Sequence, residues 1–448
     1  MAFVLPVPPM QDLKLKLQQS TLVSPAKQTE NKAFFLSNID QMLNFDVPTV
    51  HFFKANPDFP PETVAKSLKM ALERVLVHYD FLAGRFKLNL QSGCLEIDCN
   101  SAGIGFVVAT SECLLDELGD FAYPNLGFRQ LAIRTLDNLG PEVDQPLCVT
   151  QLTSFKCGGF SIGLSTNHVL LDGVSAQNFI ENLATQAFDD KPLAIFPCND
   201  RHLLAARSPP HVEFPHPEFF KPDLPAGLGL PVFDCEREEL EYTVFSLTSD
   251  AINYLKDKAR ESIGSTTTKI TVLSVVAALI WRCKALANYT EYNKDRASTL
   301  LNVVDLRSRL NPPLPNSYCG NAVLVAYSSA TCVYIEQWPF SKLVEMVAEA
   351  PKRLTDEYAK SVIDWLEINK GLPCGEYMVS SWLRMRFGEV VYPWGKPVHS
   401  GPVVSHRKDI CWIFPGVDGA NALVSLPAKE MERFVACFRE FFPKSIIN

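Results

Sequence analysis

The 448-residue sequence has no strong excess of charge of either sign. Charged residues make up 21% of the chain, and 42 basic against 50 acidic side chains leave a formal net charge of −8. No basic stripe offsets this acidic balance, which argues against a nucleic-acid partner. Long hydrophobic runs are also missing. The most apolar helix-like run, 272–281, falls far short of the roughly 20 residues that a membrane span needs. We therefore expect no nucleic-acid partner and no membrane span.

Targeting and cross-linking signals are equally scarce. The N-terminus has no basic residues before its apolar stretch, and prolines at positions 6, 8 and 9 break it, so it is unlike a signal peptide. The 13 cysteines include no CxxC pair and no His/Cys set at zinc spacing. An odd number of scattered cysteines is typical of free thiols in a reducing compartment. These absences predict a cytoplasmic protein that needs no metal.

What the sequence does contain is a histidine and an aspartate four residues apart, His168 and Asp172, followed by Gly173. The small and apolar run 155–164 predicts a strand that leads into the histidine. An imidazole titrates near neutral pH, so His168 could accept a proton from a hydroxyl and return it within one turnover. Asp172 could fix the loop or the ring through a charge-assisted hydrogen bond. Taken alone, the pair favours a plainer interpretation, in which both residues only shape a loop.

Hydrophobic periodicity predicts strands that alternate with helices along the whole chain, and therefore a mixed α/β architecture. A proline-rich stretch, 192–231, shows little periodicity and predicts a crossover between two domains. The expected helices are 60–78, 176–187, 249–260, 271–284 and one after position 427, and one expected strand of the second half is 242–247.

Several separated motifs belong together. They lie at 155–159, 168–173, 200–201, 206–210, 280–283, 305–309, 320–321, 379–382 and 394–397. In combination these motifs resemble the plant BAHD acyl-CoA-dependent acyltransferases, over essentially the whole chain. The most similar branch contains the ω-hydroxy fatty acid and fatty alcohol hydroxycinnamoyl transferases and the GLAUCE-type acyltransferases.

The resemblance implies two chloramphenicol acetyltransferase-like α/β domains that pack face to face with a solvent tunnel between them. It implies a first domain of residues 1–190 plus about 391–415, a crossover of 191–234, and a second domain of 235–390 plus about 416–448. A monomer is expected.

The resemblance also implies a reaction. An acyl group, hydroxycinnamoyl or another aromatic acyl, would move from acyl-CoA to a small-molecule or lipid alcohol, with acyl-CoA as co-substrate and no bound cofactor. His168 would act as general base without a covalent intermediate, because both substrates are bound together. Ser380 and Trp382 would stabilise the oxyanion, although plain core packing is an equal interpretation of Trp382. Asp172 and Gly173 would support the loop.

The region before Trp281 contacts CoA in members of the family. In this sequence it contains Lys269, Thr271 and Ser274. A solvated loop is the plainer interpretation of each one.

The sequence departs from the family at one motif, where Val391 replaces an aspartate that the resemblance pairs with Arg307. We expect Asp305 or Glu389 to pair with Arg307 or Arg309 instead, and Trp394 and Gly395 to support the domain contact. The departure also leaves open a second hypothesis, a non-catalytic relative that assists lipid or wax biosynthesis. A third hypothesis, a serine hydrolase, is disfavoured, because we expect no serine on a strand-to-helix elbow.

Overall fold

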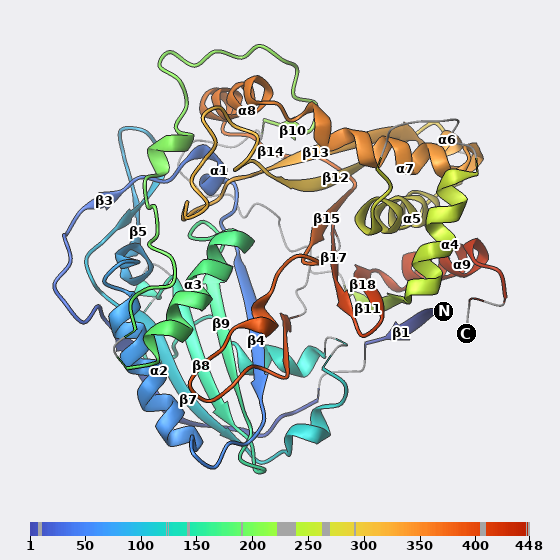
Figure 1. The fold of residues 1–448 in the computed structure, drawn as a ribbon. Coiled ribbons are helices and arrows are strands. Elements are labelled where there is room, and N and C mark those ends of the chain that lie inside the picture. The colour runs from blue at the N-terminus through green and yellow to red at the C-terminus, as the bar shows by residue number, and fades with distance from the viewer. Residues whose placement is uncertain are drawn as a thin grey trace.

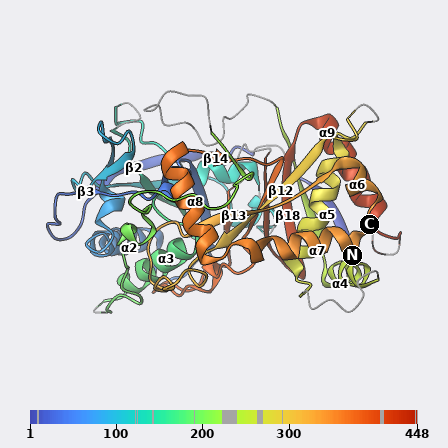
Figure 2. The ribbon, with the colours of Figure 1, turned by 90° about the horizontal axis from the view of Figure 1, so that it is seen from above.

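The computed structural model describes residues 1–7, 11–121, 123, 125–140, 144–189, 191–221, 239–261, 269–290, 293–403, 409–444 and 446. Two open sheets, each covered by helices, form two α/β domains that lie against each other (Figure 1). The view from above shows the same division, with both chain ends on the second domain (Figure 2). The predicted two-domain α/β fold is therefore confirmed.

The first domain is built on a six-stranded sheet of order β16-β4-β9-β8-β7-β2. Its strands are β2 (Leu15–Val23), β4 (Asp46–Phe53), β7 (Ile104–Ser111), β8 (Cys148–Ser154), β9 (Phe160–Asn167) and β16 (His399–Pro402). Helices α2 (Pro61–Val75) and α3 (Gly173–Gln186) share one core with this sheet. Beside it lie helix α1 (Asn38–Gln41) and a small sheet of β3 (Ala33–Phe34), β6 (Leu95–Asp98) and β5 (Arg85–Leu88).

The second domain is built on a seven-stranded sheet of order β1-β11-β18-β17-β15-β12-β13. Its strands are β1 (Ala2–Pro6), β11 (Glu241–Leu247), β12 (Ala297–Asp305), β13 (Val323–Thr331), β15 (Tyr377–Ser381), β17 (Ile410–Gly416) and β18 (Gly419–Leu426). Its helices are α4 (Ser249–Arg260), α5 (Val272–Ala287), α6 (Cys332–Gln337), α7 (Phe340–Glu349), α8 (Asp356–Asn369) and α9 (Ala428–Phe441). Helix α5 is buried along most of its length under α4, α7 and α9, because nearly all its side chains are apolar.

Short 3₁₀ helices lie at Asp80–Ala83, Leu115–Leu118, Leu126–Leu131, Arg201–Leu204, Ala350–Arg353 and Phe387–Glu389. Among the described residues, no helix is both long and apolar enough to cross a bilayer.

The sheets divide the chain differently from the expected domain bounds at two places. Strand β1 was assigned to the first domain, but it pairs with β11 in the seven-stranded sheet. Strand β17 falls mostly within the expected 391–415 segment, but it pairs with β15 and β18 of the second domain. From the second half of the chain, β16 alone among the described strands joins the six-stranded sheet, where it pairs with β4. We propose that the domains are best drawn by sheet membership.

The crossover is described from 191 to 221, and residues 222–234 lie outside the described part. Its course over the second domain is fixed by the ion pair of Arg207 Nε with Asp364 Oδ2, 2.6 Å apart, on α8. Next in sequence, β10 (Phe219–Phe220) pairs with β14 (Leu372–Pro373). The proline-rich stretch is thus held by specific contacts on α8 and β14.

Candidate active site

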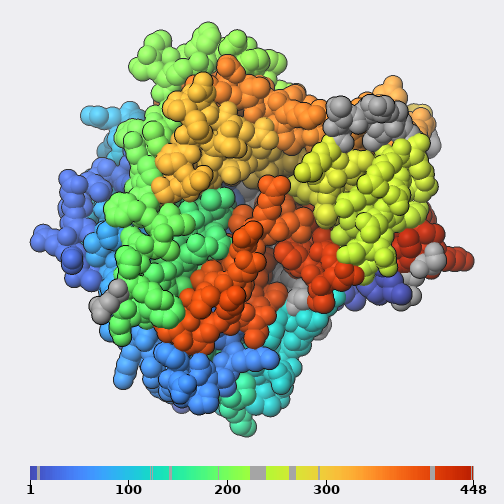
Figure 3. Space-filling model, viewed as in Figure 1, coloured from blue at the N-terminus to red at the C-terminus, as the bar shows by residue number. Residues whose placement is uncertain are grey.

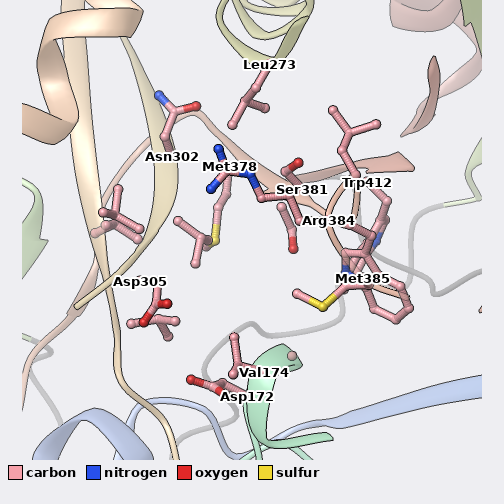
Figure 4. A pocket seen from close by; sticks show the side chains of 18 of the residues that line it. Asp172, Val174, Leu273, Asn302, Asp305, Met378, Ser381, Arg384, Met385 and Trp412 are labelled. Carbon is pink, nitrogen blue, oxygen red and sulfur yellow. The ribbon is translucent and has the colours of Figure 1, made fainter. Parts of the chain in front are cut away.

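His168 follows β9 directly and lines a cavity of about 1160 Å³. The wall on one side is the start of α3, with Asp172 and Val174, and the opposite wall is the start of α5, with Leu273 (Figure 4). Strands β12, β15 and β17 of the second domain supply much of the remaining wall. The space-filling view is hollowed near its centre, where orange, green and yellow segments of both domains meet (Figure 3). The cavity therefore lies between the domains, as the resemblance implied.

The hydrogen bonds of His168 define the tautomer of its ring. Asn321 Nδ2 donates to His168 O over 2.7 Å and to Asp40 Oδ1 over 2.8 Å, and both are pure acceptors. The other amide atom, Asn321 Oδ1, therefore faces His168 Nδ1 at 3.0 Å and must accept from it. With the proton on Nδ1, the neutral ring presents Nε2 as a lone-pair acceptor.

The environment of His168 keeps the imidazole neutral. Burial disfavours the charged ring and outweighs the hydrogen bond to Asn321 and the negative charges of Asp172 and Asp40, so the pKa of His168 lies below its ordinary value. A neutral imidazole with a free Nε2 is the form that a general base requires.

Asp172 caps α3 and forms a buried ion pair. Its Oδ1 accepts from Ser175 N over 2.9 Å, which starts the helix at Gly173, three residues before the predicted start. Arg307 binds both carboxylate oxygens, at 2.8 and 2.9 Å. Burial alone would raise the pKa of Asp172, but the charge and hydrogen bonds of Arg307 hold it below its ordinary value. Asp172 thus ties the histidine loop of one domain to the second domain.

Arg307 has Asp172 as its principal carboxylate, a pairing that the sequence did not predict. The compensating contact was expected from Asp305 or Glu389, and Asp305 Oδ1 does lie 3.1 Å from Arg307 Nη1. Val391 is 52% exposed. The valine substitution therefore leaves no buried arginine unpaired.

Arg309 and Glu389 do not take part in this pairing. Arg309 donates to the carbonyl of Pro351 over 2.7 Å, and Glu389 pairs with Arg386 at 3.9 Å.

The segment around Trp394 is anchored to the first domain by aromatic packing. Trp394 stacks on Tyr392 with ring centroids 5.0 Å apart and lies edge-on to Phe53 and Phe160. Gly395 closes the turn with φ of 113°, a conformation that favours glycine. This packing supports the predicted structural role of Trp394 and Gly395 without the family aspartate.

Gly173 lets two segments approach closely at the start of α3. A Cβ at this position would lie 2.5 Å from Met385 Cε, the flexible end of a side chain. The glycine therefore brings the loop after β15 against the histidine loop.

Ser380 and Trp382 both line the cavity. Trp382 lies edge-on to Phe387 and Trp412, with ring centroids 5.7 and 5.6 Å away. Within the described part of the chain, neither Ser380 Oγ nor Trp382 Nε1 has a hydrogen-bond partner. Both donors are thus available to a substrate atom, although Trp382 also packs against the wall.

Lys269, Thr271 and Ser274 also line the cavity. Thr271 and Ser274 form a reciprocal capping box, in which Ser274 N donates to Thr271 Oγ1 over 3.0 Å and Thr271 N donates to Ser274 Oγ over 2.9 Å. The hydrogen bonds of the two hydroxyls therefore cap the N-terminus of α5. Lys256 of α4 also lines the cavity, and no sequence motif marks it.

The sequence did not predict that Asp40 belongs to the site, nor that the side-chain amide of Asn321 contacts His168. A Ser37-x-x-Asp40 capping-box pattern marks the first of them, and the 320–321 motif marks the second. Nothing in either pattern shows that the two side chains meet, because 281 positions separate them along the chain.

The serine-hydrolase hypothesis fails on the structure. The chain has one G-x-S-x-G pattern, Gly159–Gly163, and its Ser161 is fully buried inside β9. A nucleophile elbow needs an exposed serine on a strand-to-helix turn. Among the described residues, no cluster of three His, Cys, Asp or Glu side chains is arranged to hold a metal ion.

Comparison with known proteins gives concordant results. A family model described as the Transferase family matches residues 13–440. Acyltransferase GLAUCE of Arabidopsis thaliana is 50% identical over 440 residues, covering 96% of this chain and 97% of that protein. Omega-hydroxypalmitate O-feruloyl transferase of the same plant is 32% identical over 434 residues, covering 94% and 92%.

Solved structures share the fold. Vinorine synthase matches with a TM-score of 0.73 at 21% identity, over 97% of this chain and 98% of that chain. TRI101 of F. sporotrichioides, solved with coenzyme A and T-2, matches with a TM-score of 0.72 at 18% identity, over 90% and 97%. The family model spans nearly the whole chain, and the chain is a member of the Transferase family, the BAHD acyltransferases, whose co-substrate is acyl-CoA.

Proposed function

We propose that the protein transfers an aromatic acyl group, hydroxycinnamoyl or a close analogue, from coenzyme A to the hydroxyl of an acceptor. The observation that carries the proposal is the free Nε2 of a neutral His168 inside an interdomain cavity. Two relatives support the acyl class. One is named omega-hydroxypalmitate O-feruloyl transferase and another fatty alcohol:caffeoyl-CoA acyltransferase, each 32% identical.

In the proposed reaction, both substrates occupy the cavity together. The acceptor hydroxyl attacks the thioester carbon while His168 Nε2 takes its proton, so that a tetrahedral oxyanion forms. Ser380 Oγ and Trp382 Nε1 donate to that oxyanion. The intermediate then expels the CoA thiolate, which receives the proton from His168. No bond to the protein forms at any step.

In this proposal, positive side chains bind the acyl-CoA and apolar side chains bind the alcohol acceptor. Lys256 and Lys269 line the cavity beside α5. In the proposed arrangement the phosphates of coenzyme A bind near these two positive charges. The wall near His168 is largely apolar, with Leu43, Phe45 and Leu164 among its residues. Such a wall suits an acceptor with a hydrocarbon or aromatic body.

Release of CoA tests the proposal directly. We expect the wild-type protein to release free CoA thiol from an aromatic acyl-CoA only when an alcohol is present, with the matching ester found by mass spectrometry. The control is His168→Ala, which should release none above background. If a panel of acyl-CoAs and alcohols gives no ester from folded protein, the non-catalytic accessory role takes the place of this proposal.

The oxyanion donors predict a specific kinetic effect. Ser380→Ala and Trp382→Phe should each lower kcat by about 100-fold with a smaller change in KM, because the interaction strengthens mainly in the transition state. The neighbouring Ser381→Ala, which also alters the cavity wall, is the matched control and should affect kcat less. If KM alone changes in both variants, Ser380 and Trp382 shape the pocket and do not bind the oxyanion.

A further inference from the structure

Buried hydrogen bonds connect His168 to Asp40, a residue from the first part of the chain. His168 Nδ1 lies 3.0 Å from Asn321 Oδ1, and Asn321 Nδ2 lies 2.8 Å from Asp40 Oδ1. The backbone N–H of Asn321 donates to the same carboxylate oxygen over 3.1 Å. Asp40 and Asn321 are both 0% exposed. Water therefore does not compete for these bonds, and each hydrogen-bonding atom has a protein partner.

Asp40 is itself held at both carboxylate oxygens. Ser37 donates its N–H and its hydroxyl to Oδ2, over 2.9 and 2.8 Å, in the capping box that begins α1. Arg201 Nη1 lies 2.7 Å from Oδ1, and this ion pair is almost completely buried. Arg201 also donates to the carbonyl of Leu170 over 2.6 Å, two residues after His168. The carboxylate is thus fixed in place and neutralised beside the histidine loop.

The orientation of the Asn321 amide decides which nitrogen of His168 carries the proton. A carboxylate accepts hydrogen bonds and never donates them, so Asp40 requires the amide nitrogen on its side. The amide oxygen then faces His168 and keeps the proton on Nδ1. A flipped amide would present N–H groups to Nδ1 and would favour the tautomer with its proton on Nε2. That tautomer cannot take a proton from an acceptor hydroxyl at Nε2.

We propose that Asp40 is a positioning residue for His168, which acts through Asn321 to keep Nε2 of the imidazole unprotonated. The proposal rests on the proposed role of His168 as general base. The connected residues come from α1, the crossover, the loop after β9 and the segment before β13. The correct tautomer of the base is therefore available only when both domains and the crossover are docked.

The first test replaces Asp40 with its uncharged isostere. Asp40→Asn should lower kcat by about 10- to 100-fold, the usual effect of losing a group that orients an active-site ligand or base, with little change in KM for acyl-CoA. The matched control is Asn38→Ala on the same helix, which removes hydrogen bonds to Ile363 O and Glu367 and leaves Asp40 and Asn321 in place. Asn38→Ala should reduce Tm but keep kcat near the wild-type value.

A double variant separates positioning from packing. Asp40→Asn combined with Asn321→Asp returns a carboxylate to the network and places it directly on His168 Nδ1. It should recover at least about tenfold of the kcat lost in Asp40→Asn, and the acid limb of its pH profile should move to higher pH, because a nearby negative charge raises the pKa of an imidazole. A purely structural role for Asp40 predicts neither the recovery nor the shift.

The wild-type protein supplies a measurement that does not depend on how variants fold. Histidine ¹⁵N NMR of the full chain, with the His168 signals assigned by their loss in His168→Gln, should show an unprotonated Nε2 and a protonated Nδ1 near neutral pH. A protonated Nε2 would overturn the proposal, as would wild-type kcat and an unchanged pH profile in folded Asp40→Asn. If Asp40→Asn is fully active while His168→Ala is inactive, Asp40 has no positioning role and the general base stands. Activity in His168→Ala removes the base itself.

Discussion

His168→Ala should lower kcat by at least about 100-fold, the lower end of what a general base contributes. The physical reason is that Nε2 is the lone-pair acceptor that His168 presents to the cavity. His168 lines the cavity and belongs to none of the hydrophobic core clusters, so its loss should change Tm little. Steady-state kinetics and thermal unfolding of the purified variant check both statements together.

The control for this experiment is a histidine outside the cavity. His211 is exposed on the crossover, and His211→Ala should keep the wild-type kcat. A folded His168→Ala protein with near-normal turnover would contradict the proposed mechanism.

Asp172→Asn should destabilise the protein by about 3–5 kcal/mol, since removing one partner of a buried ion pair leaves the other charge unpaired. Here the remaining charge would be Arg307, which is 5% exposed and bound to both oxygens of Asp172. The matched control is Asp305→Asn, because Asp305 contacts the same guanidinium but its side chain is 50% exposed. That variant should cost at most about 1 kcal/mol. Chemical denaturation of both variants measures the difference.

The pH dependence of this effect has a defined sign. The folded state holds the pKa of Asp172 below its ordinary value. Its contribution to stability is therefore complete above the unfolded pKa of about 4 and is lost as the pH falls through the folded pKa. The stability gap between wild type and Asp172→Asn should stay constant from about pH 5 to about pH 8 and shrink below about pH 4. If Asp172→Asn keeps wild-type stability but loses all turnover, Asp172 acts in the chemistry and not as a support.

Local patterns were enough to predict the parts of the site that are contiguous in sequence. The apolar run before His168 predicted β9, and the pattern of residues 176–187 predicted the helix that follows the histidine loop. The contact of Asp305 with Arg307 was predicted correctly from two nearby residues. The buried pairing of Arg307 with Asp172 was missed, because it joins residues 135 positions apart and leaves no periodic signal. Asp40 was overlooked for the same reason: its capping box is readable, but its contact with Asn321 exists only in the fold.

Sheet order limited the prediction of domain bounds in a similar way. A short apolar segment such as β1 reads as a strand from its sequence, but the strand that it pairs with is set by long-range packing. The whole segment of about 391–415 was expected to belong to the first domain. In the structure β16 does so, while β17, only a few residues later, returns to the second sheet.

Strands β1 and β16 each join the sheet formed mainly by the other half of the chain, which affects folding during synthesis. Ribosomes deliver the N-terminus first, yet β1 finds its neighbour only when residues 243–247 have emerged. The six-stranded sheet of the first domain is likewise incomplete until residues 399–402 have been synthesised, because they form its edge strand β16. Until the other half is complete, each half of the newly made polypeptide therefore lacks one strand of its sheet. It exposes the backbone groups that this strand later pairs with, and such unpaired groups favour aggregation. Neither half, expressed by itself, would possess a finished sheet, so the two domains should mature together and denature in one step.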